Sequence, residues 1–504
     1  MIELARTETA ESRAAGLSAS WISILVGSAI LGIVLRLDGI GASLWLDEFG
    51  TLWTVESSLR AAWNRATTFH GQTPFYYTFA WISIRLLGES EISLRLPSLV
   101  FGLATWAALA VGAWKLFGYR AGVLAFFVAA VDPTLVHASA DARPYALAFL
   151  MLSLTILGFV GTCLRQERGT RAIWVTCGAG TIWAHYVFYP FVLGIVSAYL
   201  MTRSFREQYN PRRFSRDLLA HIVLVALSAP QFIQLFARRE ELDWISHGYT
   251  GGGLAFMTMS YWLLLVLGTV AVRKREEPLP DVFRALWICI LVGALGFLSL
   301  KALGANVIHW RYTQGGLVAI ILLAAGSFSL LNRLAAPAGA VITALLLATV
   351  LQQAKGTWGT YTMIGFEDWR QAMEVLSVEL EGDTLTPVLF RSGFMEEDQT
   401  PLGSPVPTTR ATLRSPGREA PDFNLIPLTA SWNHPEREDY FEMVVLPTLD
   451  TAETFYLLSG SPLVYASCMV EWINEARPGV FEARRQNFGR VTLIRFRKAQ
   501  VSES

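Results

Sequence analysis

Two adjacent carboxylates stand just beyond the first long apolar run of the sequence. They are Asp47 and Glu48, in the segment LWLDEFGTLWTV. Ionised groups beside the hydrocarbon of a membrane are costly and usually serve a function. A carboxylate placed here, Asp47 above all, can remove a proton from a hydroxyl group. The alternative is an ordinary helix N-terminus, where acidic residues favour the helix dipole. The sequence leaves both interpretations open.

Two arginines are candidates for binding an anion. Asp141 and Arg143 lie in ASADARPYALAF, at the start of an apolar run. A guanidinium group suits phosphate oxygens, and it also suits a carboxylate that it holds in place. A structural ion pair between these two residues is the alternative. Arg311 stands between His309 and Tyr312 in NVIHWRYTQGG. It is the strongest candidate for binding phosphate, with anchoring at the membrane interface as the alternative.

Histidines and their polar neighbours are the remaining candidates. His70 and Gln72 precede Pro74 in FHGQTPFYYTFAW, where an aromatic belt at the membrane surface explains the tyrosines better than it explains the histidine. His185 and Tyr186 lie in WAHYVFYPF, and a single histidine on an apolar face is more often a packing residue. A divalent metal stays open as a cofactor. Side chains of the kinds that bind one are present, but their spacing does not decide the matter: Asp47, Glu48, His70 and His185.

The composition places these residues in a membrane protein. Hydrophobic residues make up 53% of the 504 residues and charged residues 16%, against about 25% charged in a typical soluble domain. The formal net charge is +0, so no nucleic-acid partner is expected. Apolar runs of about 17–25 residues, the length that crosses a bilayer, recur at 21–40, 95–115, 120–137, 144–164, 172–186, 188–203, 218–236, 254–272, 285–303, 314–331 and 338–354.

These runs predict an all-α domain of about eleven transmembrane helices. A further apolar segment, 74–87, is short and contains Arg85, so we expect it to lie flat in the membrane interface. Basic loops follow alternate runs, which places them in the cytoplasm. The N-terminus is then cytoplasmic, and the C-terminal part and all the candidate polar groups are extracytoplasmic. We therefore predict a multi-pass protein of the inner (plasma) membrane whose candidate site residues all lie on the extracytoplasmic side.

The composition changes near residue 355. From there to Ser504 the chain is charged and rich in proline, and it is long enough for a small domain. Apolar and amphipathic patterns predict strands at Thr386–Phe390, Met443–Leu446, Thr454–Leu458 and Arg490–Phe496, and helices at Glu367–Leu380 and Tyr465–Ala476. We therefore predict a transmembrane domain over residues 1–354 and an extracytoplasmic α/β domain over residues 355–504.

These segments, in this order, resemble the GT-C superfamily of membrane glycosyltransferases. The branch that the chain is most similar to contains the protein O-mannosyltransferases and the aminoarabinose transferase of lipid A. The resemblance rests on the pair Asp47–Glu48, the helix Pro74–Trp81, Arg95 and Pro97 in GESEISLRLPSLVFGL, the group Asp141, Arg143 and Tyr145, and the pair Arg311–Tyr312. The segment EDWRQAMEVL followed by GDTL also resembles the start of the C-terminal domain in many such proteins.

The sequence departs from the pattern at one place. The more usual His-Pro-Pro before the interfacial helix is His-Gly-Gln-Thr-Pro here, which puts the roles of His70 and Gln72 in doubt. The related lipid A enzyme has a lysine near this point, and this chain has none there.

The resemblance implies a GT-C fold whose first outer loop carries two juxtamembrane helices. It implies an inverting transfer of a monosaccharide from a polyprenyl-phosphate donor to a glycan, lipid or protein acceptor, with Asp47 as the base. Glu48 and Asp141 are the other catalytic candidates. Donor phosphate is then expected to meet Arg143, Arg311, Tyr312, His70 and Gln72. A polysaccharide polymerase or ligase and a transporter of polyprenyl lipid are the alternatives.

Overall fold

The computed structural model describes residues 19–68, 73–164, 169–204, 211–237, 281–302, 313–331, 367–393, 412–413, 416, 422–429, 431–460 and 463–499. The chain divides into two compact units. The helical unit comprises 1–38, 63–79 and 97–361, and the mixed unit comprises 39–62, 80–96 and 362–504. The predicted domain boundary at 354/355 lies outside the described residues and stays a prediction.

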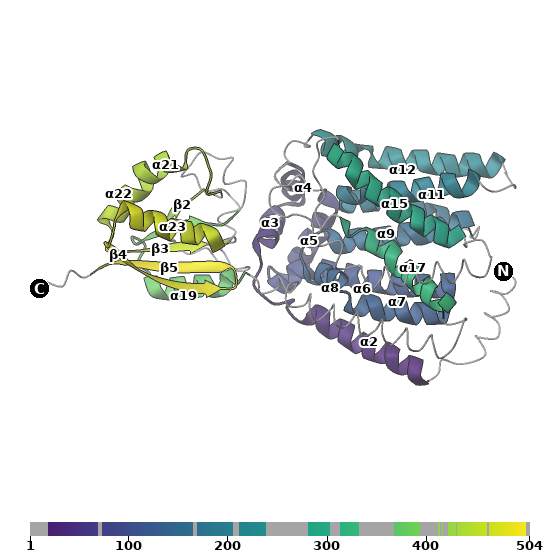
Figure 1. Cartoon of the computed structure of the whole chain (residues 1–504), viewed down its shortest axis with the longest axis horizontal. Coiled ribbons are helices and arrows are strands. Elements are labelled where there is room, and N and C mark those ends of the chain that lie inside the picture. The colour runs from purple at the N-terminus through teal and green to yellow at the C-terminus, as the bar shows by residue number, and fades with distance from the viewer. Residues whose placement is uncertain are drawn as a thin grey trace, which may run out of the picture. The chain divides into compact units, whose positions relative to one another are not determined.

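Apolar helices make up the described part of the helical unit (Figure 1). Their bounds are α2 (Ala19–Leu37), α7 (Tyr119–Val131), α8 (Pro133–Ala140), α9 (Tyr145–Phe159) with the π-helical turn η1 (Val160–Leu164), α10 (Thr170–Ala184), the 3₁₀ turn η2 (Tyr186–Phe188), α11 (Tyr189–Ser204), α12 (Pro211–Ala237), α15 (Asp281–Ala302) and α17 (Gly316–Leu331). Helix α9 packs against α10, and α11 packs against α15. Three further helices run through both units: α4 (Leu59–Thr68), α5 (Pro74–Leu87) and α6 (Glu91–Phe117).

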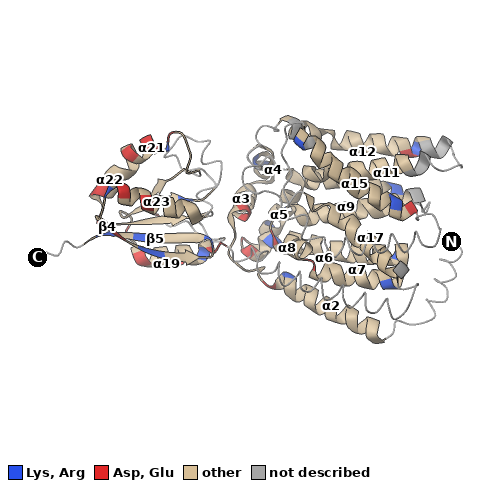
Figure 2. Cartoon of the chain, viewed as in Figure 1, with Lys and Arg blue, Asp and Glu red and all other residues tan. Residues whose placement is uncertain are grey.

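Several of the described helices are long and apolar enough to cross a membrane. Five of them pass on both counts, over Ala19–Leu37, Glu91–Phe117, Tyr145–Thr162, Ser215–Gln234 and Asp281–Ser299, and a bent pair makes a sixth if it counts as one span. Figure 2 shows that charged residues are sparse along these helices. On α2 the apolar side chains of Val26, Ile30 and Val34 recur every four residues and are more than half exposed, as lipid-facing residues must be. The predicted runs 254–272 and 338–354 lie outside the described residues.

The predicted run 120–137 is not one continuous helix. It bends by 58° between α7 and α8. Pro133 has no backbone N–H with which to continue α7, and the Asp132 carboxylate caps the new helix by accepting from the N–H groups of Thr134 (3.0 Å) and Leu135 (3.1 Å). Helix α5 is likewise too short to span a bilayer, as predicted for segment 74–87.

The bend frees carbonyl groups at the end of α7, and a buried arginine satisfies them. The Arg36 guanidinium donates to the carbonyls of Ala129 and Ala130, each at 2.8 Å, and to Ser139 Oγ at 3.2 Å. It also lies over the Trp106 ring, 5.0 Å from the centroid. An ionised side chain near hydrocarbon needs such partners, so Arg36 joins α2 to the broken helix.

The mixed unit contains a five-stranded sheet in the order β2-β1-β3-β5-β4. The strands are β1 (Pro387–Arg391), β2 (Asn424–Pro427), β3 (Thr454–Ser459), β4 (Phe481–Phe488) and β5 (Val491–Lys498). Strand β1 is parallel to β2 and β3, while β5 is antiparallel to β3 and β4. Helix α19 (Trp369–Leu380) covers one face, and α21 (Arg437–Tyr440), α22 (Leu446–Thr451) and α23 (Leu463–Ala476) lie on the other (Figure 1). The predicted small α/β domain is therefore present.

One predicted strand in this domain is wrong. Met443–Leu446 belongs to a helical stretch, the π-helical turn η5 (Phe441–Val445) followed by α22. Phe441 and Val445 are fully buried while Met443, between them, is 72% exposed, which is a helical period and not a strand period. A short apolar run does not distinguish the two by itself.

Gly194 tests the close packing of α11 on α15. A Cβ at Gly194 would lie 2.6 Å from the Cys289 carbonyl oxygen and 2.8 Å from its Cα, so the two backbones would have to separate. We expect Gly194→Ala to lower stability by about 1–3 kcal/mol, the usual cost of overpacking. A Cβ at Gly27 would meet nothing within 4 Å, so Gly27→Ala should be neutral or gain about 0.5–1 kcal/mol. Thermal melting of the purified protein in detergent measures both, and equal stability of the two variants would contradict this packing.

Candidate active site

The acidic pair occupies the first turn of α3 (Leu46–Val55) in the mixed unit. Trp45 is the N-cap residue, and its backbone N–H donates to Glu48 Oε2 at 3.3 Å. Glu48 thereby satisfies one of the donors that a helix N-terminus leaves open. Asp47 is half-buried, whereas the side chain of Glu48 is 1% exposed. The two adjacent carboxylates therefore have different environments.

Glu48 forms a buried, two-point ion pair with Arg95. Arg95 Nε donates to Glu48 Oε1 at 2.7 Å, and Arg95 Nη2 donates to Glu48 Oε2. The Arg95 side chain is 0% exposed. Such fork-to-fork pairs fix geometry as well as charge. This contact favours a positioning role for Glu48 and leaves Asp47 as the better-placed candidate for proton transfer.

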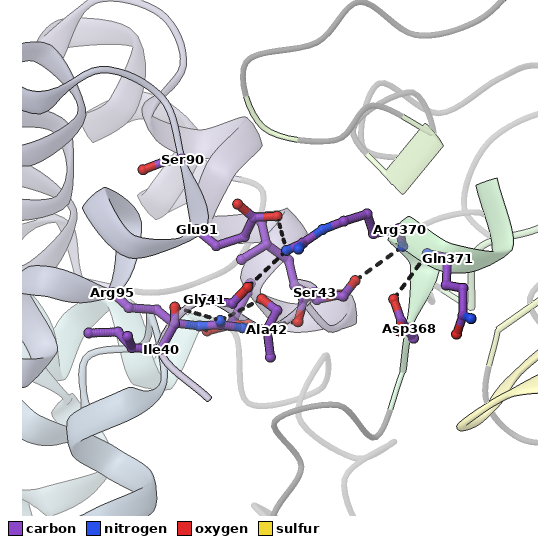
Figure 3. A network of polar contacts seen from close by, with 12 residues as sticks. Ile40, Gly41, Ala42, Ser43, Ser90, Glu91, Arg95, Asp368, Arg370 and Gln371 are labelled. Atoms are coloured by element: carbon purple, nitrogen blue, oxygen red, sulfur yellow. Dashed lines mark hydrogen bonds and ion pairs between the residues drawn. The ribbon is translucent and has the colours of Figure 1, made fainter. Parts of the chain in front are cut away.

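The same arginine also holds the loop that leads into α3. Its Nη1 donates to the carbonyls of Gly39 (3.1 Å), Ile40 (3.0 Å) and Ala42 (2.7 Å), and Nη2 donates to the Ser43 carbonyl at 3.1 Å. Figure 3 shows the loop residues Ile40, Ala42 and Ser43 beside the Arg95 guanidinium group. Arg95 thus fixes both the loop and the helix that carry the acidic pair. In the sequence, only the family pattern singles out Arg95.

A second group of predicted residues meets in the helical unit. Asp141 is the C-cap residue of α8, and the Arg143 N–H donates to its carbonyl at 2.7 Å. His185 follows α10, and its ring lies 5.0 Å from that of Tyr145. Tyr186 follows in the buried turn η2. The structure therefore brings the segments around Arg143 and His185 together.

Residues that the sequence analysis did not single out complete this group. The Tyr76 hydroxyl and Ser98 Oγ are 2.7 Å apart, and Ser98 Oγ donates to the Arg143 carbonyl at 3.3 Å. Thr73 Oγ1 donates to the Ala184 carbonyl at 2.8 Å. The start of α5 therefore lies beside both segments. His137 Nε2, one helical turn before Asp141, is 3.7 Å from Asp141 Oδ2. The i, i+4 spacing of the two residues in the sequence could have indicated this contact.

Five predicted site residues lie outside the described residues: His70, Gln72, His309, Arg311 and Tyr312. Their roles stay predictions. Among the residues that the structure describes, no three His, Cys, Asp or Glu side chains gather as a metal site would require. His70, one of the four residues considered for a metal, is not among those searched.

Known proteins resemble the chain in sequence over one segment and in fold over nearly all of it. Residues 71–233 match the family model described as dolichyl-phosphate-mannose-protein mannosyltransferase. ArnT from Cupriavidus metallidurans, in the apo state and bound to undecaprenyl phosphate, has 14% sequence identity and a TM-score of 0.55, with 95% of this chain and 98% of ArnT covered in each case. An oligosaccharyltransferase from Archaeoglobus fulgidus has 14% identity and a TM-score of 0.45, covering 87% of this chain and 68% of the other. No curated protein sequence matches.

The predicted resemblance to the GT-C superfamily is confirmed by these matches. The fold is similar to that of ArnT, and the segment that matches the family model contains the whole Arg143–His185 group. Asp47 and Glu48 lie before that segment.

Replacing Glu48 tests the buried ion pair. Glu48→Gln leaves the Arg95 guanidinium buried without its counter-charge, which typically costs about 3–5 kcal/mol. We expect a lower melting temperature and faster proteolysis of the full-length protein. The double variant Glu48→Met/Arg95→Met should lose less stability than the sum of the two single variants, because no unpaired charge remains. Asp47→Asn, at the half-buried neighbour, is the control and should melt close to wild type. Additive losses would contradict the pair.

Proposed function

We propose that the protein is an inverting glycosyltransferase. It moves a monosaccharide from a polyprenyl-phosphate donor to an acceptor hydroxyl on the extracytoplasmic face of the membrane. The observation that carries this proposal is the pair at the start of α3, where Arg95 holds Glu48 and Asp47 stands next to it, half-buried. The fold shared with ArnT, which has been solved with undecaprenyl phosphate, supports the donor class. The mannosyltransferase family model supports the reaction class.

The chemistry requires one base and a site for an anion. Asp47 takes the proton of the acceptor hydroxyl while the acceptor oxygen attacks the anomeric carbon. The bond between that carbon and the phosphate oxygen breaks, and the polyprenyl phosphate leaves with the bonding electrons. Attack from the face opposite the leaving group inverts the anomeric configuration.

The leaving phosphate needs charge stabilisation more than protonation. Arg143 and Arg311 are the proposed partners of the phosphate oxygens, and Tyr312, His70 and Gln72 are further candidates. Preorganised groups of this kind often make the largest contribution to catalysis, and loss of one costs about 2.7–4 kcal/mol in barrier height. His185, which stacks on Phe188 and adjoins Tyr145, supports the segment that carries Arg143. Tyr186 and His309 remain candidates for contacts to the sugar.

The location is part of the same proposal. The proposed topology has a cytoplasmic N-terminus, a transmembrane domain over residues 1–354 and an extracytoplasmic domain over residues 355–504. Asp47 then lies on the extracytoplasmic face of the inner membrane. The acceptor is a glycan, a lipid or a protein.

Asp47→Asn tests the base. An amide of the same shape cannot accept the acceptor proton, so we expect the transfer rate to fall by about two to four orders of magnitude. The measurement is release of undecaprenyl phosphate from a panel of undecaprenyl-phosphate monosaccharides, followed by mass spectrometry with a lipid extract as acceptor source. Binding of undecaprenyl phosphate itself should change little. Asp439→Asn, at an exposed carboxylate in α21, is the control. Near-normal turnover by Asp47→Asn would show that Asp47 is not the base, and donor movement without transfer would indicate a transporter.

The orientation is tested by cysteine labelling in a variant whose four cysteines are replaced by serine. Arg60→Cys and Ser215→Cys place thiols at two exposed positions. A membrane-impermeant maleimide applied from outside intact spheroplasts should label position 60 and not 215. After permeabilisation both should react. The reverse pattern would contradict an extracytoplasmic active site.

A further inference from the structure

The EDWR motif, residues 367–370, lies at the start of α19 and contacts the loop that carries the acidic pair. All of these residues belong to the mixed unit. The motif is anchored in the sheet, because Glu367 forms an antiparallel bridge with Gly489 and the Asp368 N–H donates to the Phe488 carbonyl at 3.1 Å. The carboxylate of Asp368 then caps α19 by accepting from the Gln371 N–H at 3.0 Å. The motif is therefore a fixed point of the C-terminal domain.

Arg370 joins this fixed point to both chain segments around the acidic pair. Its backbone N–H donates to Ser43 Oγ at 3.2 Å, and its Nη2 donates to the Gly41 carbonyl at 3.0 Å. The same Nη2 forms an ion pair with Glu91, in the first turn of α6. Figure 3 shows Arg370 reaching the loop from the side opposite Arg95. Two arginines, one from α6 and one from the C-terminal domain, thus hold the same loop.

Glu367 contacts the helix start itself. Its Oε2 accepts from the Leu46 N–H at 3.0 Å and from Trp369 Nε1 at 3.0 Å. Leu46 is the first residue of α3 and directly precedes Asp47. Its N–H is one of the donors that a helix N-terminus cannot satisfy internally, so a residue 321 positions away provides the missing acceptor. The Trp369 ring also packs edge-on against Phe49, one turn further along α3.

The charges agree with this placement. The pKa of Glu367 is raised, first by burial and further by the negative charge of Asp47. The hydrogen bonds from Trp369 and Leu46 and the charge of Arg490 act in the opposite direction. Glu367 also accepts from the N–H of Leu46, the residue directly before Asp47, so it lies beside the backbone that carries the proposed base. The C-terminal domain therefore shapes the surroundings of the proposed base as well as its backbone.

We propose that the C-terminal domain positions the catalytic carboxylate, with Arg370 and Glu367 as positioning residues for Asp47. This inference rests on the proposed function and deepens it. A base must be held within a fraction of an ångström, and a displacement of about 1 Å can cost on the order of a hundredfold in rate. The donor-binding candidates Arg143 and Arg311 belong to the helical unit. Release of the loop that carries Asp47 should therefore slow the transfer step without weakening the binding of the donor.

Hydrogen–deuterium exchange tests the positioning without any substrate. In the full-length protein in lipid nanodiscs, Arg370→Ala should speed amide exchange over residues 40–50 by about tenfold or more, because the loop opens locally. Arg477→Ala is the matched control. Arg477 is also 35% exposed and pairs with a carboxylate, Asp450, in the same domain, and its described contacts do not include this loop. Exchange should then match wild type. Equal exchange in both variants overturns the inference, provided that both melt as cooperatively as wild type.

Reversing the charge at position 370 tests whether the positioning of Asp47 matters for sugar transfer. Arg370→Glu should lower kcat about 10- to 100-fold and leave KM for the undecaprenyl-phosphate sugar within about twofold. The value of kcat is expressed per mole of folded protein, counted by its binding of undecaprenyl phosphate, so that a loss of folded protein cannot produce the fall. Arg370→Glu/Glu91→Arg should restore much of the rate, and Arg370→Lys should retain more activity than Arg370→Ala. Normal kcat in a variant whose loop exchanges faster overturns the inference. Absence of transfer by the wild type with every donor contradicts the proposed function instead, while the exchange experiment still decides whether Arg370 holds the loop.

Discussion

The buried ion pair between Glu48 and Arg95 is the interaction that fixes the position of α3 and of the loop before it in the mixed unit. Removing two charges from water is costly, and only complete use of their donors and acceptors offsets that cost. Arg95 meets this condition with two contacts to Glu48 and four backbone carbonyls between Gly39 and Ser43. A loop without regular secondary structure therefore has a defined path. The position of α3, and with it the position of Asp47, follows from that path.

The sequence predicted which segments carry candidate site residues, but not how these residues pair. Glu48 and Arg95 are 47 residues apart, and no helical or strand period relates them. The same holds for Arg370 and Glu91, which are separated by 279 residues. Polar residues at the ends of apolar runs can be recognised because they are costly there. Their partners are chosen by tertiary folding, so the sequence could not assign Glu48 to Arg95 or tell its role from that of Asp47.

The fold was predictable where hydropathy alone decides it. The apolar runs of α2, α6, α9 and α15 were all located, because a span needs a continuous apolar stretch. The bend between α7 and α8 was missed because the run stays apolar on both sides of Asp132–Pro133, although that dipeptide is itself a helix-start signal. Strand β4 was missed for the opposite reason. It is an edge strand, and its sequence FEARRQNF is mostly polar and exposed between two buried phenylalanines.

The contacts of Arg36 have a consequence for biosynthesis. The carbonyl of Ala129 that it binds lies 93 residues further along the chain. At a translation rate of about 5–20 residues per second, α2 waits roughly 5–20 s in the membrane before its partner helix exists. During that interval the guanidinium group must snorkel to the lipid headgroups. Docking of α7 then replaces the headgroup contacts of Arg36 with the carbonyls of Ala129 and Ala130.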